Sequence, residues 1–154
     1  MKIVSVAEDK KIEKRISITP DVVKKYSSIG VEVCLPKSYG ALLGFGDDQY
    51  ISQGAKILEN EKDLIEKADI IVQLGLPSDE KLSLLKENQS LIGVLNSYAN
   101  KEKLEDLAKR KINSFSLELL PRITRAQSMD ILSSQANLAG YKAVIESFAH
   151  FEKA

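Results

Sequence analysis

Short apolar runs alternate along this chain with amphipathic stretches, and this alternation constrains the fold more than any other feature. The runs are rich in Ile, Val and Leu and mostly uncharged; they are Ile3–Ala7, Val31–Leu35, Ile70–Leu74, Leu91–Leu95 and Ser114–Leu119. Strands buried on both faces of a helix-covered parallel sheet have this composition. The pattern predicts an α/β fold with right-handed crossovers: a three-layer, mostly parallel sheet of about five strands, Rossmann-like or flavodoxin-like, with a long C-terminal helix.

The segments between the runs carry helix signals. Thr19 can cap a helix, Pro20 suits its first position, and Gly30 can end it. Gly140 lies in a stripe of small residues in the last helix, where glycine costs about 1 kcal/mol relative to alanine. We therefore expect that stripe to pack closely against another backbone. The other expected helices are Asp47–Gln53, Glu61–Ala68, a helix from Ser78, Lys101–Arg110, and the long helix from about Ile131 to Glu152.

Composition narrows the classes of protein that the chain can represent. Its 154 residues fit one domain, and 22 basic against 22 acidic residues give a net charge of zero. This balance does not suggest nucleic acid or an anionic membrane as a partner. The single cysteine, Cys34, lies in an apolar run, which indicates a small buried hydrophobe and a reducing compartment. Neither a secretion signal nor a membrane span is expected.

Familiar cofactor motifs are missing or incomplete. Gly44-Phe45-Gly46 begins like a dinucleotide fingerprint, but Gln49 stands where the third glycine belongs, and a turn-like segment precedes it. The pattern therefore favours a plain turn. His150 is the only histidine and lies near the end of the last helix, so neither a His-based metal site nor a catalytic triad is available. We expect no metal cofactor.

The densest set of polar side chains follows the last apolar run; it comprises Arg122, Arg125, Gln127, Asp130 and Ser133. Arginine offers a rigid fork of donors, and Gln and Asp can hold a carboxamide or a ribose. Asp130 could equally cap the following helix and pair with Arg125. From the residues alone, a ligand-binding loop and a capped, salt-bridged helix start remain equally good interpretations.

Arg15 is a second position of interest, because it lies just beyond the carboxyl end of the first predicted strand. Open α/β sheets bind ligands in that region. A surface arginine on a loop is an equally good interpretation.

The segment Pro121–Ile145 closely resembles the NAD(H)-binding α subunit of the proton-translocating NAD(P) transhydrogenases, in the alanine dehydrogenase/transhydrogenase family. Its sequence from Arg125 to Tyr141, RAQSMDILSSQANLAGY, is close to that family's signature sequence. The segments 13–25, 41–50 and 68–72 are also similar to the family. The resemblance therefore extends along the whole chain.

The resemblance implies a fold, an activity and a set of partners. The family's NAD(H)-binding component has two α/β domains, and residues 1–154 correspond to the first; the nucleotide-binding Rossmann domain is absent from this chain. The implied activity is reversible hydride transfer between NAD(H) and NADP(H), coupled to proton translocation. The implied partners are that missing domain, membrane and NADP(H)-binding components, and a second copy in a homodimer. The implied location is cytoplasmic, peripheral on the inner membrane, and the chain alone is expected to be inactive.

The resemblance also implies roles for four residues. Arg122 would hold the carboxamide region of NAD(H), Asp130 and Ser133 would orient the nicotinamide, and Gln127 would reach toward NADP(H). Hydride transfer needs two rings held in contact and shielded from water, without an acid or a base. Arg122, Gln127 and Asp130 are accordingly the expected catalytic residues.

Two other functions stay open. Alanine dehydrogenases share the fold but carry a Lys after the third strand and a His after the fourth, where this chain reads Val72–Gly75 and Leu95–Ser97. The absence of both residues makes amino-acid oxidation the weaker interpretation. The other alternative is a non-catalytic module in which the small-residue helix serves dimerisation or docking.

Overall fold

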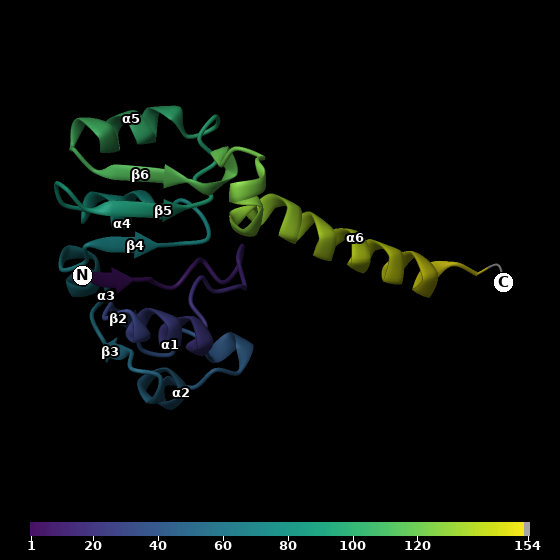
Figure 1. Cartoon of the computed structure of the whole chain (residues 1–154), viewed down its shortest axis with the longest axis horizontal. Helices are drawn as coiled ribbons and strands as arrows, with labels where there is room; N and C mark the ends of the chain where they lie inside the picture. Colours follow the sequence, from purple (N-terminus) through teal and green to yellow (C-terminus); the bar gives the residue numbers. More distant parts are fainter. Residues whose placement is uncertain (153–154) are drawn as a thin grey trace. The chain divides into compact units, whose positions relative to one another are not determined.

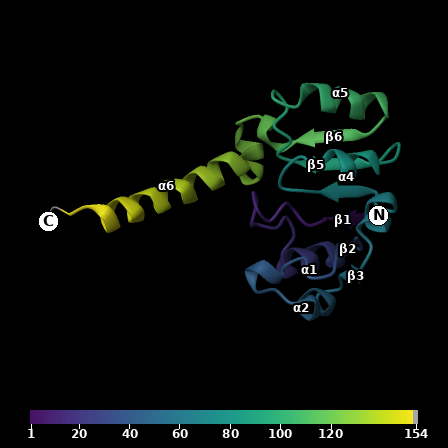
Figure 2. The same ribbon diagram turned by 180° about the vertical axis from the view of Figure 1, so that it is seen from behind.

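The computed structural model describes residues 1–152 and divides into two compact units, which meet in the chain between Ser116 and Leu117. The first unit holds a six-stranded sheet in the order β3-β2-β1-β4-β5-β6, and its neighbouring strands run parallel (Figures 1 and 2). The strands are β1 (Lys2–Val4), β2 (Glu32–Pro36), β3 (Lys56–Leu58), β4 (Ile70–Val72), β5 (Ser90–Gly93) and β6 (Asn113–Ser116).

This strand order is that of dinucleotide-binding Rossmann sheets and not the 2-1-3-4-5 order of flavodoxin. The order reverses between β1 and β4, which are central neighbours in the sheet. The carboxyl ends of these two strands form the topological switch point, the place where open α/β sheets usually accept ligands.

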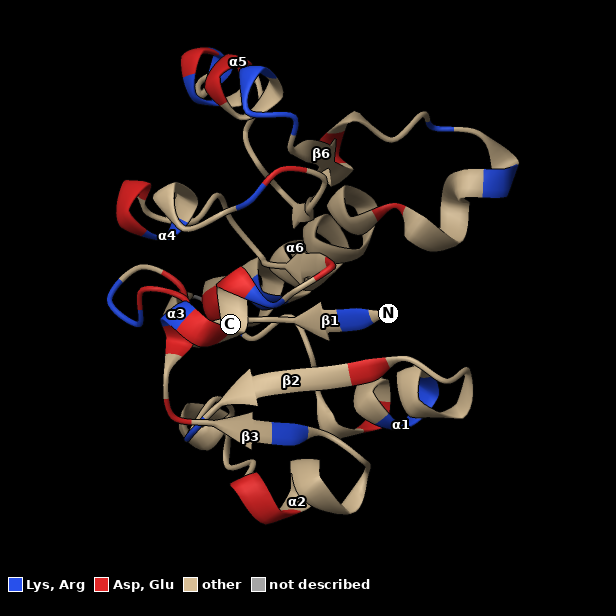
Figure 3. Ribbon diagram, turned by 90° about the vertical axis from the view of Figure 1, so that its left-hand side faces the viewer, with Lys and Arg blue, Asp and Glu red and all other residues tan. Residues whose placement is uncertain are grey.

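Helices cover both faces of the sheet, as the three-layer prediction requires. Ile3 and Val4 show the alternation: Ile3 packs with the core around α1 and α2, and Val4 packs with the core around α3, α4 and α5. Figure 3 shows α3 and α4 on the opposite side of the sheet from α1. The helices are α1 (Pro20–Ser28), α2 (Asp47–Ser52), α3 (Glu61–Glu66), α4 (Asp79–Ser83) and α5 (Lys101–Lys109).

The expected helices are all present, with shifts of a few residues at their ends. Thr19 stands at the N-cap position of α1 and Pro20 at its first position, as predicted, although the Thr19 side chain makes no capping hydrogen bond. The expected count of strands was one too low, because β3 is a three-residue edge strand whose Lys56 and Leu58 are exposed. The last strand ends earlier than predicted, and the chain continues as a short 3-10 helix, η2 (Leu117–Leu119).

Buried polar side chains complete the core of the first unit. Gln89 is 5% exposed. Its side-chain Nε2 donates to the backbone carbonyls of Ile65 and Ala68 at 2.7 and 2.8 Å, and its Oε1 accepts from the backbone amide of Lys86 at 2.7 Å. Cys34 is buried as expected, and burial raises the pKa of its thiol to about 11. The thiol is therefore protonated and inert at neutral pH.

The second unit consists of η2, a second 3-10 helix, η3 (Thr124–Met129), and the long helix α6 (Ile131–His150). No residue of α6 is buried within the described part of the chain. Space is open around Gly140, because a Cβ atom at that position would meet no atom of another segment within 4 Å. The close packing expected for the small-residue stripe is therefore not made by residues 1–152.

Gly93 provides a test of how closely β4 and β5 approach. A Cβ atom at this position would lie 2.6 Å from the backbone oxygen of Gln73, whereas one at Gly75 would meet nothing within 4 Å. We expect Gly93→Ala to lower the free energy of unfolding by about 1–3 kcal/mol, because strand backbones cannot move apart without losing ladder hydrogen bonds. Gly75→Ala should change it by less than about 0.5 kcal/mol. Urea denaturation of both variants measures the difference, and equal losses would contradict the close approach.

Candidate functional site

The predicted polar segment folds into η3, directly before α6. Ile123 is extended, and the amide of Ala126 then donates to the Ile123 carbonyl at 2.9 Å, a 3-10 hydrogen bond. Ala126 is the one buried residue of η3, at 5% exposure, so it anchors the turn while its polar neighbours face outward. Most of the segment predicted as a polar loop is therefore a 3-10 helix.

Asp130 ends η3 and caps α6. Its Oδ1 accepts from the Ser133 amide at 3.0 Å and its Oδ2 from the Ser133 hydroxyl at 2.7 Å. These bonds, first that of the hydroxyl and then that of the amide, lower the pKa of Asp130, and the charge of Arg122 adds to the effect. Asp130 is therefore ionised at neutral pH. The capping interpretation is correct, because the carboxylate accepts from a free backbone amide of the first turn. The ion pair with Arg125 that was also considered is not formed among residues 1–152.

A surface cavity of about 230 Å³ lies beside this helix start. Three of the predicted site residues, Arg122, Gln127 and Asp130, line it together. Within residues 1–152, the side chains of Arg122 and Gln127 make no hydrogen bond, so their donors and acceptor remain available. Ser133 and Arg125 do not line the cavity. Ser133 contributes indirectly, because its hydroxyl donates to Asp130, which does line it.

The walls of the cavity come from residues that the sequence did not single out. Pro121, Ile123 and Thr124 supply apolar surface and one hydroxyl, and the buried Ala126 also lines it. Each of them is adjacent in the sequence to a predicted polar residue, and that position was the available signal. The cavity therefore combines a cation, an anion, a carboxamide and apolar contact within ten residues of sequence.

Arg15 occupies a different setting in the first unit. Its Nε and Nη2 donate to the two carboxylate oxygens of Glu13 at 2.9 and 2.6 Å. Hydrogen bonding to Arg15 holds the pKa of Glu13 at about 2. Arg15 also lines a small surface hollow with Glu8 and Tyr39, so its guanidinium is part of a polar cluster and not simply solvated.

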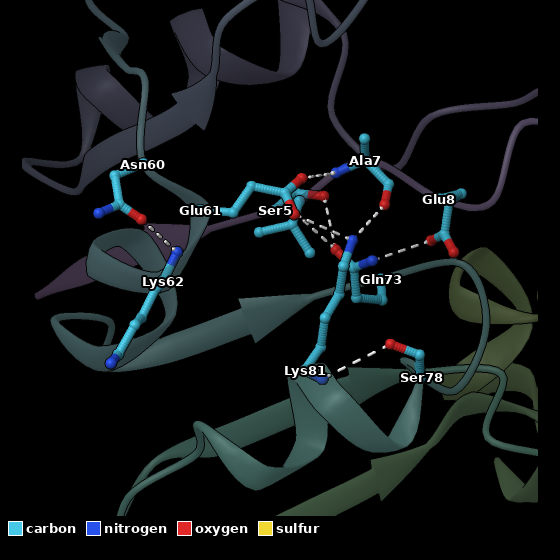
Figure 4. Close-up of polar contacts among 10 residues, drawn as sticks. Ser5, Ala7, Glu8, Asn60, Glu61, Lys62, Gln73, Ser78 and Lys81 are labelled. Carbon is cyan, nitrogen blue, oxygen red and sulfur yellow. Dashed lines mark hydrogen bonds and ion pairs between the residues drawn. The ribbon is translucent and has the colours of Figure 1, made fainter.

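Sequence reasoning did not identify the polar network at the switch point (Figure 4). Gln73 follows β4 and is 3% exposed; its Oε1 accepts from the Ser5 hydroxyl at 3.0 Å and from the Val6 amide at 2.9 Å. Its Nε2 donates to Glu8 at 3.2 Å. A glutamine inside an apolar run was the signal for it.

The remaining sequence interpretations have clear outcomes. Gly44 has a φ of 80° and ends a 3-10 turn over Ala41–Leu43, so the incomplete glycine motif is a turn, as expected. His150 has a side chain that is 79% exposed. Among residues 1–152 no group of three His, Cys, Asp or Glu side chains could hold a metal ion. In the same range, no helix is long and apolar enough to cross a membrane.

The sheet order defines a Rossmann-type α/β domain, and the cavity beside α6 defines a polar contact site. Comparison with known proteins supports the assignment of the α/β domain. Residues 5–139 match the sequence model of the alanine dehydrogenase/PNT N-terminal domain. The chain therefore belongs to the alanine dehydrogenase/transhydrogenase family, as its N-terminal domain.

Individual relatives refine this assignment. The chain is 41% identical over its whole length to the first part of NAD(P) transhydrogenase subunit alpha from Rickettsia prowazekii, and 40% identical to that from Rhodospirillum rubrum. The crystal structure of transhydrogenase from Sinorhizobium meliloti superposes with a TM-score of 0.89 at 36% identity, covering 99% of this chain and 46% of that one. An L-alanine dehydrogenase structure gives 0.71 at 25% identity, covering 77% of this chain and 32% of that one. The chain spans 41% of the length of the two bacterial subunits.

The cap of α6 is testable by substitution and by pH. Asp130→Ala removes the acceptor for the Ser133 amide, so the first turn of α6 should fray and the helical circular dichroism signal should fall; Asp130→Asn keeps an acceptor oxygen and should retain most of it. In the folded protein the pKa of Asp130 is lowered. The ionised cap therefore stabilises the fold fully at pH values above the pKa of the unfolded chain, and this stabilisation is lost as pH falls through the pKa of the folded protein. Equal frayed signals for both variants would contradict the cap.

Proposed function

We propose that this chain acts as the first domain of the NAD(H)-binding component of a proton-translocating NAD(P) transhydrogenase. The observation that carries the proposal is the convergence of Arg122, Gln127 and Asp130 on one cavity at the start of α6. Relatives that bear the transhydrogenase name cover this chain completely. The reaction would be reversible hydride transfer between NAD(H) and NADP(H).

The chemistry of the cavity suits a nicotinamide carboxamide. That group presents one carbonyl acceptor and two N–H donors, so it needs a donor and an acceptor placed together. Arg122 offers the donors, ionised Asp130 offers acceptors, and Ile123 with Pro121 offers an apolar surface for a ring. Hydride transfer requires positioning and exclusion of water, which such a surface supplies without an acid or a base.

The residues take distinct roles in this proposal. Arg122 holds the carboxamide of NAD(H), and Asp130, fixed by Ser133, orients it. Gln127, whose side chain has no hydrogen bond of its own among residues 1–152, reaches toward the nicotinamide of NADP(H) on a partner subunit.

Further parts of the assembly complete the proposal. Helix α6 exposes Leu138, Tyr141, Ile145 and Phe148, with 45 to 77% of each residue accessible. An apolar surface of this kind marks an interface. We assign it to the nucleotide-binding domain and to a homodimer contact. The complex would lie on the cytoplasmic face of the inner membrane, together with its membrane and NADP(H)-binding components.

Alanine dehydrogenase is the second candidate, because relatives with that name share the family and the fold; one from Staphylococcus aureus is 28% identical over 145 residues. The end of β4 carries Gln73 and Gly75, and Gln73 is buried in hydrogen bonds to Ser5, Val6 and Glu8. No lysine or histidine stands at the positions that the resemblance assigns to amino-acid chemistry. Oxidation of NADH that depends on pyruvate and ammonium, measured with the nucleotide-binding domain present, would favour this candidate.

Gln127→Asn in the complete enzyme tests the transhydrogenase assignment. The shortened side chain withdraws the carboxamide by one methylene, and we expect the rate of hydride transfer to fall by roughly 10–100-fold, since small misplacements are costly in such reactions. NADH affinity should stay within about threefold. Transfer is followed with NADPH and an NAD analogue whose reduced form absorbs at its own wavelength. The matched control is Gln53→Asn in the first unit, which should transfer at the wild-type rate; a Gln127→Asn enzyme as fast as that control would refute the role.

A further inference from the structure

The carboxyl ends of β1 and β4, where an open α/β sheet usually holds its ligand, are filled by the chain itself. Glu8 lies in the segment that follows β1, and its carboxylate contacts the end of β4 (Figure 4). Its Oε1 accepts from the Leu74 amide at 2.7 Å and from Gln73 Nε2 at 3.2 Å. These are the contacts that the carboxyl group of a bound small molecule would make.

The donors at this position are rigid. The side-chain carbonyl of Gln73 accepts hydrogen bonds from Ser5 and Val6, and this fixes the direction of the side-chain NH2 group. The Leu74 amide belongs to the chain just beyond β4, which is held in the sheet by β1 and β5. Two fixed neutral N–H groups therefore converge on one oxygen position.

The residue before Glu8, Ala7, is held through both of its backbone groups. Glu61 at the start of α3 accepts from the Ala7 amide at 3.3 Å, and Lys81 of α4 donates to the Ala7 carbonyl at 2.7 Å. Lys81 and Glu61 are themselves 3.3 Å apart. Glu8 is thus presented to the end of β4 by contacts that do not involve its own side chain.

We propose that the end of β4 is a binding site for one carboxyl or carboxamide group, and that the side chain of Glu8 is its built-in occupant. With Glu8 in place, the switch point is closed to free ligands of this class. The site takes short monocarboxylic acids and their amides, because the part of Glu8 beyond Cβ has the same heavy atoms as acetate. The inference is independent of the proposed function, since neither nucleotide nor the residues of the second unit take part in it.

The site has a preference between the charged and the neutral form of its occupant. Burial raises the pKa of Glu8, while the amides of Leu74 and Gly75 oppose that shift. The negative charge of Glu13 raises it further, and Lys81 lowers it. Because the raised pKa means that ionisation is disfavoured, a neutral amide should fit at least as well as a carboxylate.

Glu8→Ala in the full chain should create an empty site that small molecules can refill. We expect its melting temperature to fall by about 3–6 °C, a shift of the size usual when buried donors lose the acceptor they share. Acetate or acetamide should restore at least half of that loss at pH 7, with acetamide no weaker than acetate. Pivalate, which carries the same carboxylate on a bulkier group, should not restore it.

The controls are wild type, Glu8→Gln and Glu59→Ala. Glu8→Gln keeps the acceptor oxygen and should melt no lower than wild type, and Glu59→Ala removes a carboxylate whose side chain is 85% exposed. None of the three should respond to acetate or acetamide. An equal response in Glu8→Ala and the controls, or an equal effect of pivalate, would overturn the proposal.

A second measurement does not depend on whether Glu8→Ala folds. Glu8→Asp keeps the charge but is one methylene shorter, so its carboxylate should not reach the Leu74 amide. We expect hydrogen exchange at the Leu74 amide to become at least about tenfold faster than in wild type, whereas that of the Gln89 amide should be unchanged. Unchanged exchange at Leu74 would also overturn the proposal.

Discussion

The buried carboxamide of Gln73 is the interaction on which the centre of the sheet depends. It joins β1 to β4 beyond the last residues of their ladder, by accepting from the Ser5 hydroxyl and the Val6 amide. At 3% exposure, an unpaired carboxamide or amide here would cost about 1–3 kcal/mol for each group left unsatisfied. The strands therefore keep their register at the point where the order reverses, and both core layers depend on that register through Ile3 and Val4.

The same network explains why the switch point is not an open crevice. Once Gln73 is fixed, its amide needs an acceptor, and Glu8 supplies one at 3.2 Å. Tyr39 fills the end of β1 in the same way. Its hydroxyl forms a hydrogen bond of 2.7 Å with the Ser5 hydroxyl and accepts from the Ser17 amide at 3.0 Å. The cavity with available hydrogen-bonding groups lies instead beside α6, in the second unit.

Much of the fold could be predicted because its signals are local. Apolar runs and helix-start signals such as Thr19-Pro20 act within a few residues, and they indicated each α-helix and five of the strands in residues 1–152, but not the 3-10 helices. The short strand at Lys56 could not be found in this way, because its pairing with Cys34 is a contact between distant residues and only its central residue, Ile57, is partly buried. The cap by Asp130 could be predicted, because an acidic residue directly before a helix is a local signal. Only the geometry of the helix start shows that its carboxylate bonds Ser133 and not Arg125.

The candidate site was predictable to the same extent. Polar residues clustered in sequence indicated a possible ligand-binding loop, and three of them, Arg122, Gln127 and Asp130, line one cavity. The switch-point network was not indicated, because Glu8 and Gln73 are 65 residues apart and the charged run that begins at Glu8 gives no sign of a partner beyond β4. Long-range pairs of single residues leave no periodic pattern, so only the folded arrangement reveals them.

Helix α6 shows how the site and the proposed assembly are linked. A 20-residue helix is only marginally stable in water unless its apolar side chains are covered, and no residue of α6 is buried within the described part of the chain. The Asp130 cap stabilises its first turn, but a cap cannot replace burial of Leu138 or Phe148. A partner that covers α6 would hold the helix, and through the cap it would hold Asp130 at the edge of the cavity. In the proposed enzyme, assembly and positioning of the nicotinamide are therefore coupled through one helix terminus.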